Sequence, residues 1–474
     1  AVTGVTSGQY GNSGTYSVVV TASEQLEDAP TLSLSGGSVG SGTGSGAGSK
    51  TIWTYTFTPT DADEAVTIDV AAGAITDLAG NDNTAAATQF TFTHDQTAPT
   101  ASIAVTGVTS GQYGNSATYS VVVTASEQLD GAATLSLSGG SVGSGTGSGG
   151  GSVTIWTYTF TPTSADQSVT IDVAAGGITD KAGNDNTAAA TQFTFTHDRT
   201  DPTVVITSTS VNTGGSHNAA LTMIFTFSEE MTGIADGDFT FTNCASSSYS
   251  VQTANTVFHQ VCTPSTDGAT VTVAVDASKG TDAAGNANSA ATSFTFTYDT
   301  TAPTSSIAVT GVTSGQYGTA ATYSVVVTAS EQLEDAPTLS LAGGSVGGGT
   351  GSGAGSKTIW TYTFTPTSND QSVTIDVAAG AITDAAGNDN TAAATQFAFT
   401  HDRTAPTITT VAVAGATEDG YGVASTYAVT ITPSETLGAV PTLTVTGGSI
   451  TTAGAASGSN YVYTVTPTDA DEAM

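Results

Sequence analysis

A loop motif rich in oxygen ligands, D-x-A-G-N-x-N, occurs four times in the chain. The fixed aspartate and the two fixed asparagines of the copies are Asp77, Asn81 and Asn83; Asp180, Asn184 and Asn186; Asp282, Asn286 and Asn288; and Asp384, Asn388 and Asn390. Ca²⁺ takes about six to eight oxygens from carboxylates, amide carbonyls and backbone carbonyls in a flexible loop. Asp and Asn alternating around a glycine supply such oxygens where the chain can turn sharply. The motif therefore predicts a calcium site.

Two further sets of carboxylates, elsewhere in the same unit, could join the loop residues to complete such a site. The first set follows a Val-rich or Phe-rich strand and consists of Glu24, Glu127, Glu229 and Glu331. The second set precedes a proline-containing junction and consists of Asp95, Asp198, Asp299 and Asp402. A metal at these aspartates would tie the end of one repeat to the start of the next and stiffen the junction. The alternative is that A-G-N is only a left-handed turn in which Asp and Asn bond their own backbone. The twelve-residue EF-hand pattern is absent.

The chain carries no residue set typical of an enzyme. No G-x-S-x-G sequence and no Ser/His/Asp arrangement is present. Asp61, Asp63 and Glu64 could suggest glycoside hydrolysis, but residues 164–167 of a near-copy read Ser-Ala-Asp-Gln. A pair of carboxylates that is missing from a near-copy indicates a solvated turn, so we expect no catalysis.

Internal repeats define the organisation of the chain. The string AVTGVTSGQYG begins at Ala1, Ala104 and Ala308, at intervals of 103 residues and then 204 residues. Catalysis needs one unique set of residues, whereas a spacer needs repeated length, so near-identical copies favour a structural role. We expect five units, at residues 1–97, 98–200, 201–300, 301–403 and 404–474. The first lacks a lead-in strand, the third is divergent and the fifth is incomplete, which favours a segment of a longer protein over a subunit completed by a neighbour's strand.

Within each unit the apolar residues alternate with polar ones. Trp53, Tyr55 and Phe57 fall on one face of a predicted strand over residues 51–60, with threonines on the other. Such a period of two indicates half-buried antiparallel strands, and about seven of them per ~100 residues predict a two-sheet sandwich. The Gly/Ser-rich stretch at 36–49 lies inside a unit and is expected to form either an edge strand or a long hairpin.

Charge excludes several classes of partner. Lys and Arg total 6 and Asp and Glu total 40, a formal net charge of −34. So acidic a surface repels phosphate, which excludes nucleic acid. No apolar run approaches the ~20 residues of a spanning helix, so no membrane insertion is expected in this segment.

The two cysteines, Cys244 and Cys262, both lie in the third unit beside β-like runs. Neighbouring antiparallel strands could bring them together as a disulfide worth ~3 kcal/mol by loop closure. The alternative is two free buried thiols. Zinc is excluded because the pair and His259 supply too few ligands.

The repeat motifs together resemble the bacterial Ig-like repeats of giant secreted adhesins and other surface proteins. The resemblance rests on TAPT at the unit start, SE after a Val-rich strand, and D-x-A-G-N-x-N before a final F-x-F-x-x-D strand, and it covers essentially the whole chain. It implies an all-β tandem array of Ig-like antiparallel β-sandwiches, extracellular display at the cell surface, a spacer or adhesive role and, frequently, bound calcium.

These observations lead to one expected function and one alternative. Short junctions fixed by proline predict an extended rod, a non-enzymatic segment of a surface filament or adhesin stalk stiffened by calcium. Its partner in a fibre would be the chain itself. The alternative is a module that binds glycans or a host surface, with candidates in the GQYG loops at Tyr10, Tyr113 and Tyr317.

Overall fold

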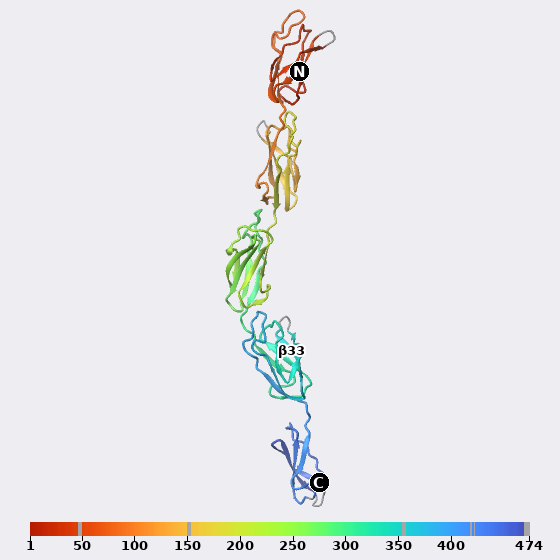
Figure 1. Cartoon of the computed structure of the whole chain (residues 1–474), viewed down its shortest axis with the longest axis vertical. Helices are drawn as coiled ribbons and strands as arrows, with labels where there is room; N and C mark the ends of the chain where they lie inside the picture. The colour runs from red at the N-terminus through yellow and green to blue at the C-terminus, as the bar shows by residue number, and fades with distance from the viewer. Residues whose placement is uncertain (46–49, 149–152, 353–356, 418–419, 421, 469–474) are drawn as a thin grey trace. The chain divides into compact units, whose positions relative to one another are not determined.

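The structure is a computed structural model, and it describes residues 1–474 except 46–49, 149–152, 353–356, 418–419, 421 and 469–474. The described residues contain no α-helix and only one 3-10 turn, η1 (Asp236–Asp238). Everything else that is regular is β-strand, arranged as successive sandwiches along the chain (Figure 1). We call each sandwich a module and the junction of consecutive modules a joint. The prediction of tandem β-sandwiches is confirmed.

Contacts between residues divide the chain into two compact units. The first comprises Ala1–Thr213, Ala220–Thr263 and Val271–Thr295, and the second comprises Gly214–Ala219, Pro264–Thr270 and Phe296–Met474.

The second module illustrates the fold. One sheet has the order β10 (Ala101–Val105), β12 (Tyr119–Ala125), β16 (Ile155–Pro162) and β14 (Gly140–Val142), with β15 (Thr146–Ser148) also paired to β16. The facing sheet has the order β11 (Tyr113–Gly114), β18 (Phe193–Asp198), β17 (Asp166–Asp172) and β13 (Ser136–Ser138). All neighbours are antiparallel except β11 and β18, which are parallel.

The first and fourth modules repeat this topology strand for strand. In the first, the sheets comprise β1 (Val2–Thr3), β3 (Tyr16–Thr21), β7 (Ile52–Pro59), β5 (Gly37–Val39) and β6 (Thr43–Ser45), facing β2 (Tyr10–Gly11), β9 (Phe90–Asp95), β8 (Asp63–Asp69) and β4 (Ser33–Ser35). In the fourth they comprise β27 (Ser305–Val309), β29 (Tyr323–Ala329), β33 (Ile359–Pro366; labelled in Figure 1), β31 (Gly344–Val346) and β32 (Thr350–Ser352), facing β28 (Tyr317–Gly318), β35 (Phe397–Asp402), β34 (Asp370–Asp376) and β30 (Ser340–Ala342).

The other two modules vary the pattern. The third has one long hairpin in place of the glycine-rich edge, with sheets β19 (Val204–Ser208), β21 (Leu221–Phe227), β24 (Val257–Pro264) and β23 (Cys244–Thr253), and β20 (Ser216–His217), β26 (Phe294–Tyr298), β25 (Thr270–Val275) and β22 (Phe239–Thr242). The described part of the fifth forms a single sheet of β36 (Ile408–Val413), β37 (Tyr427–Pro433), β39 (Asn460–Pro467) and β38 (Gly448–Ser457).

The alternation of apolar and polar residues places the cores. Trp53, Tyr55 and Phe57 on β7 are buried, whereas the threonines between them are exposed or half-buried. The equivalent Phe160 of the second module is fully buried and packs edge-on against Phe195 of the facing sheet. The predicted period of two therefore selects the residues that join the two sheets.

The glycine-rich stretch is an edge strand in two pieces, β5 and β6, both paired with β7. Its last residues, 46–49, lie outside the described residues. The glycines are needed because the edge lies directly over the aromatic rings of β7. A Cβ on Gly37 would lie 2.3 Å from Cζ of Phe57, and one on Gly42 would lie 2.6 Å from Cε1 of Tyr55.

A buried polar contact explains part of the divergence of the third module. The Tyr119 hydroxyl lies 2.9 Å from Nδ1 of His197, and a Cβ on Gly114 would lie 2.9 Å from the same hydroxyl. The first and fourth modules contain the same three residue types. The third module changes all three positions together, to Leu221, Tyr298 and His217. Loss of the tyrosine removes the crowding that requires glycine.

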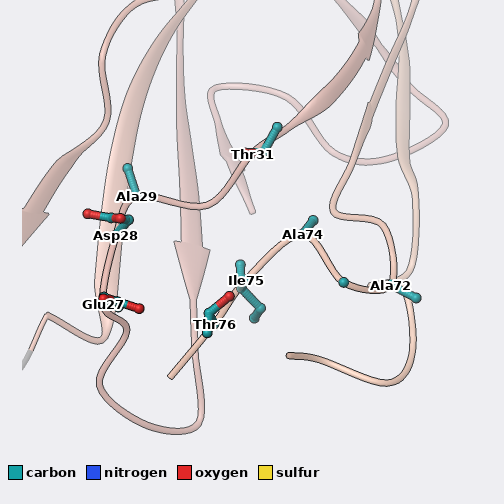
Figure 2. Close-up of a pocket in the computed structure, with 9 residues that line it drawn as sticks. Glu27, Asp28, Ala29, Thr31, Ala72, Ala74, Ile75 and Thr76 are labelled. Carbon is teal, nitrogen blue, oxygen red and sulfur yellow. The ribbon is translucent and has the colours of Figure 1, made fainter. Parts of the chain in front are cut away.

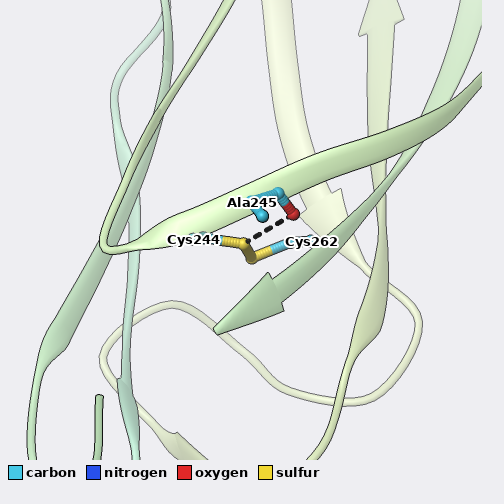
Figure 3. The surroundings of a disulfide bond; sticks show 3 residues. All are labelled: Cys244, Ala245 and Cys262. Atoms are coloured by element: carbon cyan, nitrogen blue, oxygen red, sulfur yellow. Dashed lines mark hydrogen bonds between the residues drawn. A yellow bond between two sulfur atoms is a disulfide. The ribbon is translucent and has the colours of Figure 1, made fainter. Parts of the chain in front are cut away.

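The predicted disulfide is present in the third module. Cys244 begins β23 and Cys262 lies on β24, the neighbouring strand, with an S–S distance of 2.00 Å (Figure 3). Cys262 is fully buried. The disulfide fastens the two strands of the long hairpin, where the other full modules have the glycine-rich edge.

Candidate metal centres at the joints

The D-x-A-G-N-x-N loop folds around its aspartate. In the second module, Oδ1 of Asp180 accepts hydrogen bonds of 2.8 Å from the backbone N–H groups of Ala182 and Asn184. Gly183 between them has φ of 92°, a conformation that glycine adopts without strain. The left-handed turn, which the sequence analysis gave as the alternative to a metal site, is therefore present. The second carboxylate oxygen, Oδ2 of Asp180, accepts a hydrogen bond of 2.8 Å from the side-chain amide of Asn184.

The second asparagine of the motif holds the loop closed within its own module. Oδ1 of Asn186 accepts from the backbone N–H of Ile178 at 3.0 Å, and its Nδ2 donates to the carbonyls of Ala174 and Ala188. Asn83, Asn288 and Asn390 make the equivalent bonds. Because both polar atoms of these amides are used, their role is to shape the loop.

The structure groups the predicted carboxylates across the joints. Three clusters each bring a ligand oxygen of every member within 4.8 Å of the others, and they consist of Asp95, Glu127 and Asp180; Asp198, Glu229 and Asp282; and Asp299, Glu331 and Asp384. The first aspartate of each cluster lies at the end of the last strand of one module, as the final residue of β9 (Asp95) and β18 (Asp198) and directly after β26 (Asp299), and the other two residues belong to the next module. We call these the joint carboxylate clusters. Each lies wholly within one of the two compact units.

This grouping differs from the sequence-based expectation in one respect. That expectation joined each strand-end aspartate to the loop of its own repeat, for example Asp95 to Asp77. In the structure Asp95 lies instead beside Asp180 of the following module. The strand carries its aspartate to the opposite end of the sandwich from the module's own loop, so only the next loop is within reach.

The exposed fractions of equivalent side chains show how much a joint buries them. Asp180 and Asp384 are each 1% exposed, and Asp282 is 4% exposed. The equivalent Asp77 of the first module belongs to no joint carboxylate cluster among the described residues and is only half-buried, while Glu24 and Asn81 are exposed.

The clusters raise the pKa of several of their carboxyl groups. Burial, followed by the charge of Asp95, raises the pKa of Glu127 to about 7. Burial, followed by the charge of Asp299, raises the pKa of Glu331 to about 7. Burial likewise raises the pKa values of Glu229, Asp95 and Asp198. Gathered carboxylates without a cation thus oppose their own ionisation.

A neighbouring aspartate in each module is stabilised as a carboxylate. The Thr97 hydroxyl donates to Oδ2 of Asp63, which lowers the pKa of Asp63. The equivalents Asp166, Asp267 and Asp370 bind the threonines of the following linkers, and their pKa values are lowered too. These aspartates anchor the linker, a role that the sequence analysis missed because it interpreted residues 61–64 only as a solvated turn.

The fourth joint has two of the three carboxylates among the described residues. Burial, followed by the charge of Asp402, raises the pKa of Glu435. Glu435 was absent from the predicted ligands, although it follows Ser434 in the same Ser-Glu pair as Glu127. That pair was the signal that could have identified it.

The chain also has a shallow hollow of about 450 Å³ in the first module. Figure 2 shows Glu27, Asp28 and Ala29 along one side and Ile75 and Thr76 along the other. Its lining includes the acidic side chains of Glu27 and Asp28 and contains no histidine or cysteine.

A family model described as bacterial Ig-like domain matches the chain four times in tandem, at residues 3–94, 95–197, 198–298 and 299–401. The chain belongs to the bacterial Ig-like domain family. The first three matches end one residue before Asp95, Asp198 and Asp299, so the joint carboxylate clusters lie between successive bacterial Ig-like domains.

Other comparisons add little to this assignment. A crystal structure of the I9–I11 tandem from titin is similar at 8% identity, with a TM-score of 0.19, over 63% of this chain and 97% of that chain. A likeness at this level carries no argument about function. A search of curated proteins finds no match. None of the described residues forms a helix of the length and apolarity that crossing a membrane requires.

Proposed function

We propose that the chain is a non-enzymatic structural segment of an extracellular prokaryotic surface filament or adhesin stalk, and that Ca²⁺ stiffens its joints. The tandem of bacterial Ig-like domains supports the structural role, because each module adds length and none of the first four carries a residue set that its near-copies lack, apart from the disulfide of the third. Display outside the cell agrees with the disulfide and with the usual setting of this family.

The observation that carries the proposal is the recurrence of the joint carboxylate clusters. Each is assembled by two consecutive modules, so a cation bound there would contact both of them. An Asp–Glu–Asp set offers only hard oxygen atoms, as Ca²⁺ prefers. In the part of the chain that the structure describes, the one salt bridge is between Lys181 and Asp130, so no basic side chain neutralises a cluster. The residues present therefore fit Ca²⁺.

The ligands would be the three carboxylates of each cluster. In the first cluster these are Asp95, Glu127 and Asp180, with the remaining coordination positions open to water or backbone oxygen. Bound Ca²⁺ supplies positive charge that offsets the repulsion among the carboxylates. The second asparagines, which include Asn186, would hold the loop in shape without touching the ion.

Negative-stain microscopy of the full chain with Ca²⁺ and with chelator tests the proposal. We expect straight, extended particles with Ca²⁺ and a wider range of bend angles after chelation. Compact particles in both conditions, or bend angles that do not respond to Ca²⁺, contradict it.

A second candidate function, adhesion to surface glycans, is favoured by exposed aromatic side chains. Tyr10, Tyr113 and Tyr317 of the GQYG loops are 39%, 48% and 71% exposed. Stacking of tyrosine on a sugar ring would use these faces. Retention of the full chain on immobilised glycans, lost after substitution of the three tyrosines by serine, supports it, and passage without retention opposes it.

A further inference from the structure

The first asparagine of each loop makes a contact that involves no carboxylate of the neighbouring module. Nδ2 of Asn184 donates to Oδ2 of its own Asp180 at 2.8 Å and to the backbone carbonyl of Asp95, in the preceding module, at 3.0 Å. Both amide hydrogens are thus committed to oxygen acceptors. This commitment fixes the orientation of the amide, and its Oδ1 must face a donor.

The donor comes from a residue of the preceding module that the sequence analysis did not single out. Nδ2 of Asn12 lies 3.2 Å from Oδ1 of Asn184. Asn12 follows the short strand β2, whose pairing with β9 positions it at the end of the module. The Gln96 side chain donates to the backbone carbonyl of Asn12 at 3.1 Å and holds this loop beside the linker.

The same amide pair occurs at the next two joints. Asn115 donates to Asn286 at 3.2 Å, and Asn218 donates to Asn388 at 3.0 Å. Asn286 and Asn388 in turn donate to the carbonyls of Asp198 and Asp299. We call Asn12–Asn184, Asn115–Asn286 and Asn218–Asn388 the joint amide pairs.

The divergent third module retains this asparagine although its neighbours differ. The two residues before Asn115 are Tyr-Gly, and the two before Asn218 are Ser-His. A residue required only by the fold of its own module has no evident reason to stay when its local contacts change. The contact that Asn218 keeps is the one with the following module.

The fourth module departs from this pattern. Thr319 occupies the position of Asn12, in the sequence Tyr317-Gly318-Thr319. A threonine carries no amide, and its hydroxyl oxygen lies one bond closer to the backbone than the amide nitrogen of an asparagine. The exposed Thr319 therefore cannot supply the same donor to the joint that follows it.

We propose that the joint amide pairs are a metal-independent clamp that fixes the orientation of consecutive modules at the first three joints. The inference does not depend on Ca²⁺, because every atom of the clamp belongs to an asparagine, an aspartate carbonyl or the loop aspartate. The donor asparagine of the clamp is present at the first three joints, and Thr319 stands at its position in the fourth module.

Distances between paired spin labels test the clamp in the full chain under chelator, so that failure of the calcium proposal cannot affect the result. Labels at Ser38→Cys and Ser141→Cys, both exposed sites, span the first joint. Labels at Ser141→Cys and Thr240→Cys, also exposed, span the second. The native cysteines are joined in a disulfide and do not take the label.

The variant Asn12→Asp keeps the shape of the side chain but turns an oxygen toward Oδ1 of Asn184, and Asn12→Ala removes the donor. Because a lost donor leaves its acceptor unpaired, we expect either variant to broaden the first-joint distance distribution about twofold. The second joint is the matched control: its amide pair, Asn115–Asn286, does not involve Asn12, so both variants should leave the second-joint distribution unchanged. Unchanged melting of the variants confirms that the modules remain folded. First-joint distributions as narrow in the variants as in the unmodified chain, or second-joint distributions that broaden to the same extent, overturn the proposal.

Discussion

At the scale of single residues, near-copies within one chain separate joint chemistry from module architecture. Glu24 and Glu127 occupy the same position of the repeat, but only Glu127 belongs to a joint carboxylate cluster. The repeat thus contains its own control for every joint substitution. Residue types and spacing predicted oxygen-rich loops, because the repeated Asp and Asn are visible in the sequence. They did not determine which loop lies beside which strand end.

Glu127→Gln should remove one calcium site and leave the others. The described residues contain three joint carboxylate clusters, so we expect calorimetric titration of the unmodified chain to give three sites of this kind and the variant to give two. Glutamine keeps the shape but loses the charge that attracts the ion. The matched variant Glu24→Gln should retain all three, and an equal loss in both variants would show that the clusters are not the sites.

Calcium affinity should decrease as the pH falls through about 7. Glu127 and Glu331 have pKa values of about 7 in the folded chain, raised by burial and neighbouring carboxylates. Above that value the carboxylates are free to bind, and below it a proton must leave first, so affinity should drop by up to about tenfold per pH unit. Titrations at several pH values measure this slope, and a flat profile through pH 7 would contradict the assignment.

The same shifts set the pH dependence of stability without metal. The folded chain holds these protons more tightly than the unfolded chain, in which a glutamate titrates near 4.5. Their stabilising contribution is therefore complete below that pH and is lost as the pH rises through about 7. The chelated chain should melt at a lower temperature above pH 7 than near pH 5, and this difference should be smaller in Glu127→Gln, which lacks one of the two groups.

At the scale of elements, glycine allows an edge strand to lie over a row of aromatic rings. Composition alone makes residues 36–49 resemble a linker, and the repeat position alone argues against one. Neither could choose between a hairpin and an edge strand. The choice depends on Phe57 and Tyr55 of β7, whose rings occupy the space that side chains on β5 and the following turn would need.

Gly37→Ala should therefore destabilise the first module. Its Cβ would meet the fully buried Phe57 ring and the Thr58 carbonyl at 2.6 Å or less. Overpacking of this kind costs about 1–3 kcal/mol, which lowers the melting temperature of a ~100-residue domain by roughly 4–8 °C per kcal/mol. Calorimetry of the full chain should show a new transition at lower temperature. Gly40→Ala, where a Cβ meets nothing within 4 Å, is the control and should leave the melt unchanged.

At the scale of the whole molecule, repulsion among the many carboxylates opposes folding. The net charge of −34 includes three clusters in which carboxylates gather with no basic partner among the described residues. Like charges at such separations repel, and dissolved salt screens the repulsion. Stability of the metal-free chain should therefore depend strongly on ionic strength.

Melting of the chelated chain in increasing NaCl measures this dependence. We expect the melting temperature to rise as the Debye length shrinks from ~30 Å at 0.01 M to ~3 Å at 1 M. With Ca²⁺ bound the rise should be much smaller, because the ion has already offset the clustered charge. An equal salt response with and without Ca²⁺ would indicate that the repulsion does not reside at the joints.

The sequence by itself determined the modules of this protein. The period of two selects which side chains are buried, and the repeats number the modules, because burial pattern and copy number are local properties of the chain. Only the tertiary structure decided which residues form the joints. A strand carries Asp95 away from its own loop and toward that of the next module, and the same contact pairs Asn12 with Asn184. Such neighbours are far apart in sequence, here 172 residues for the asparagines, and no spacing rule links them.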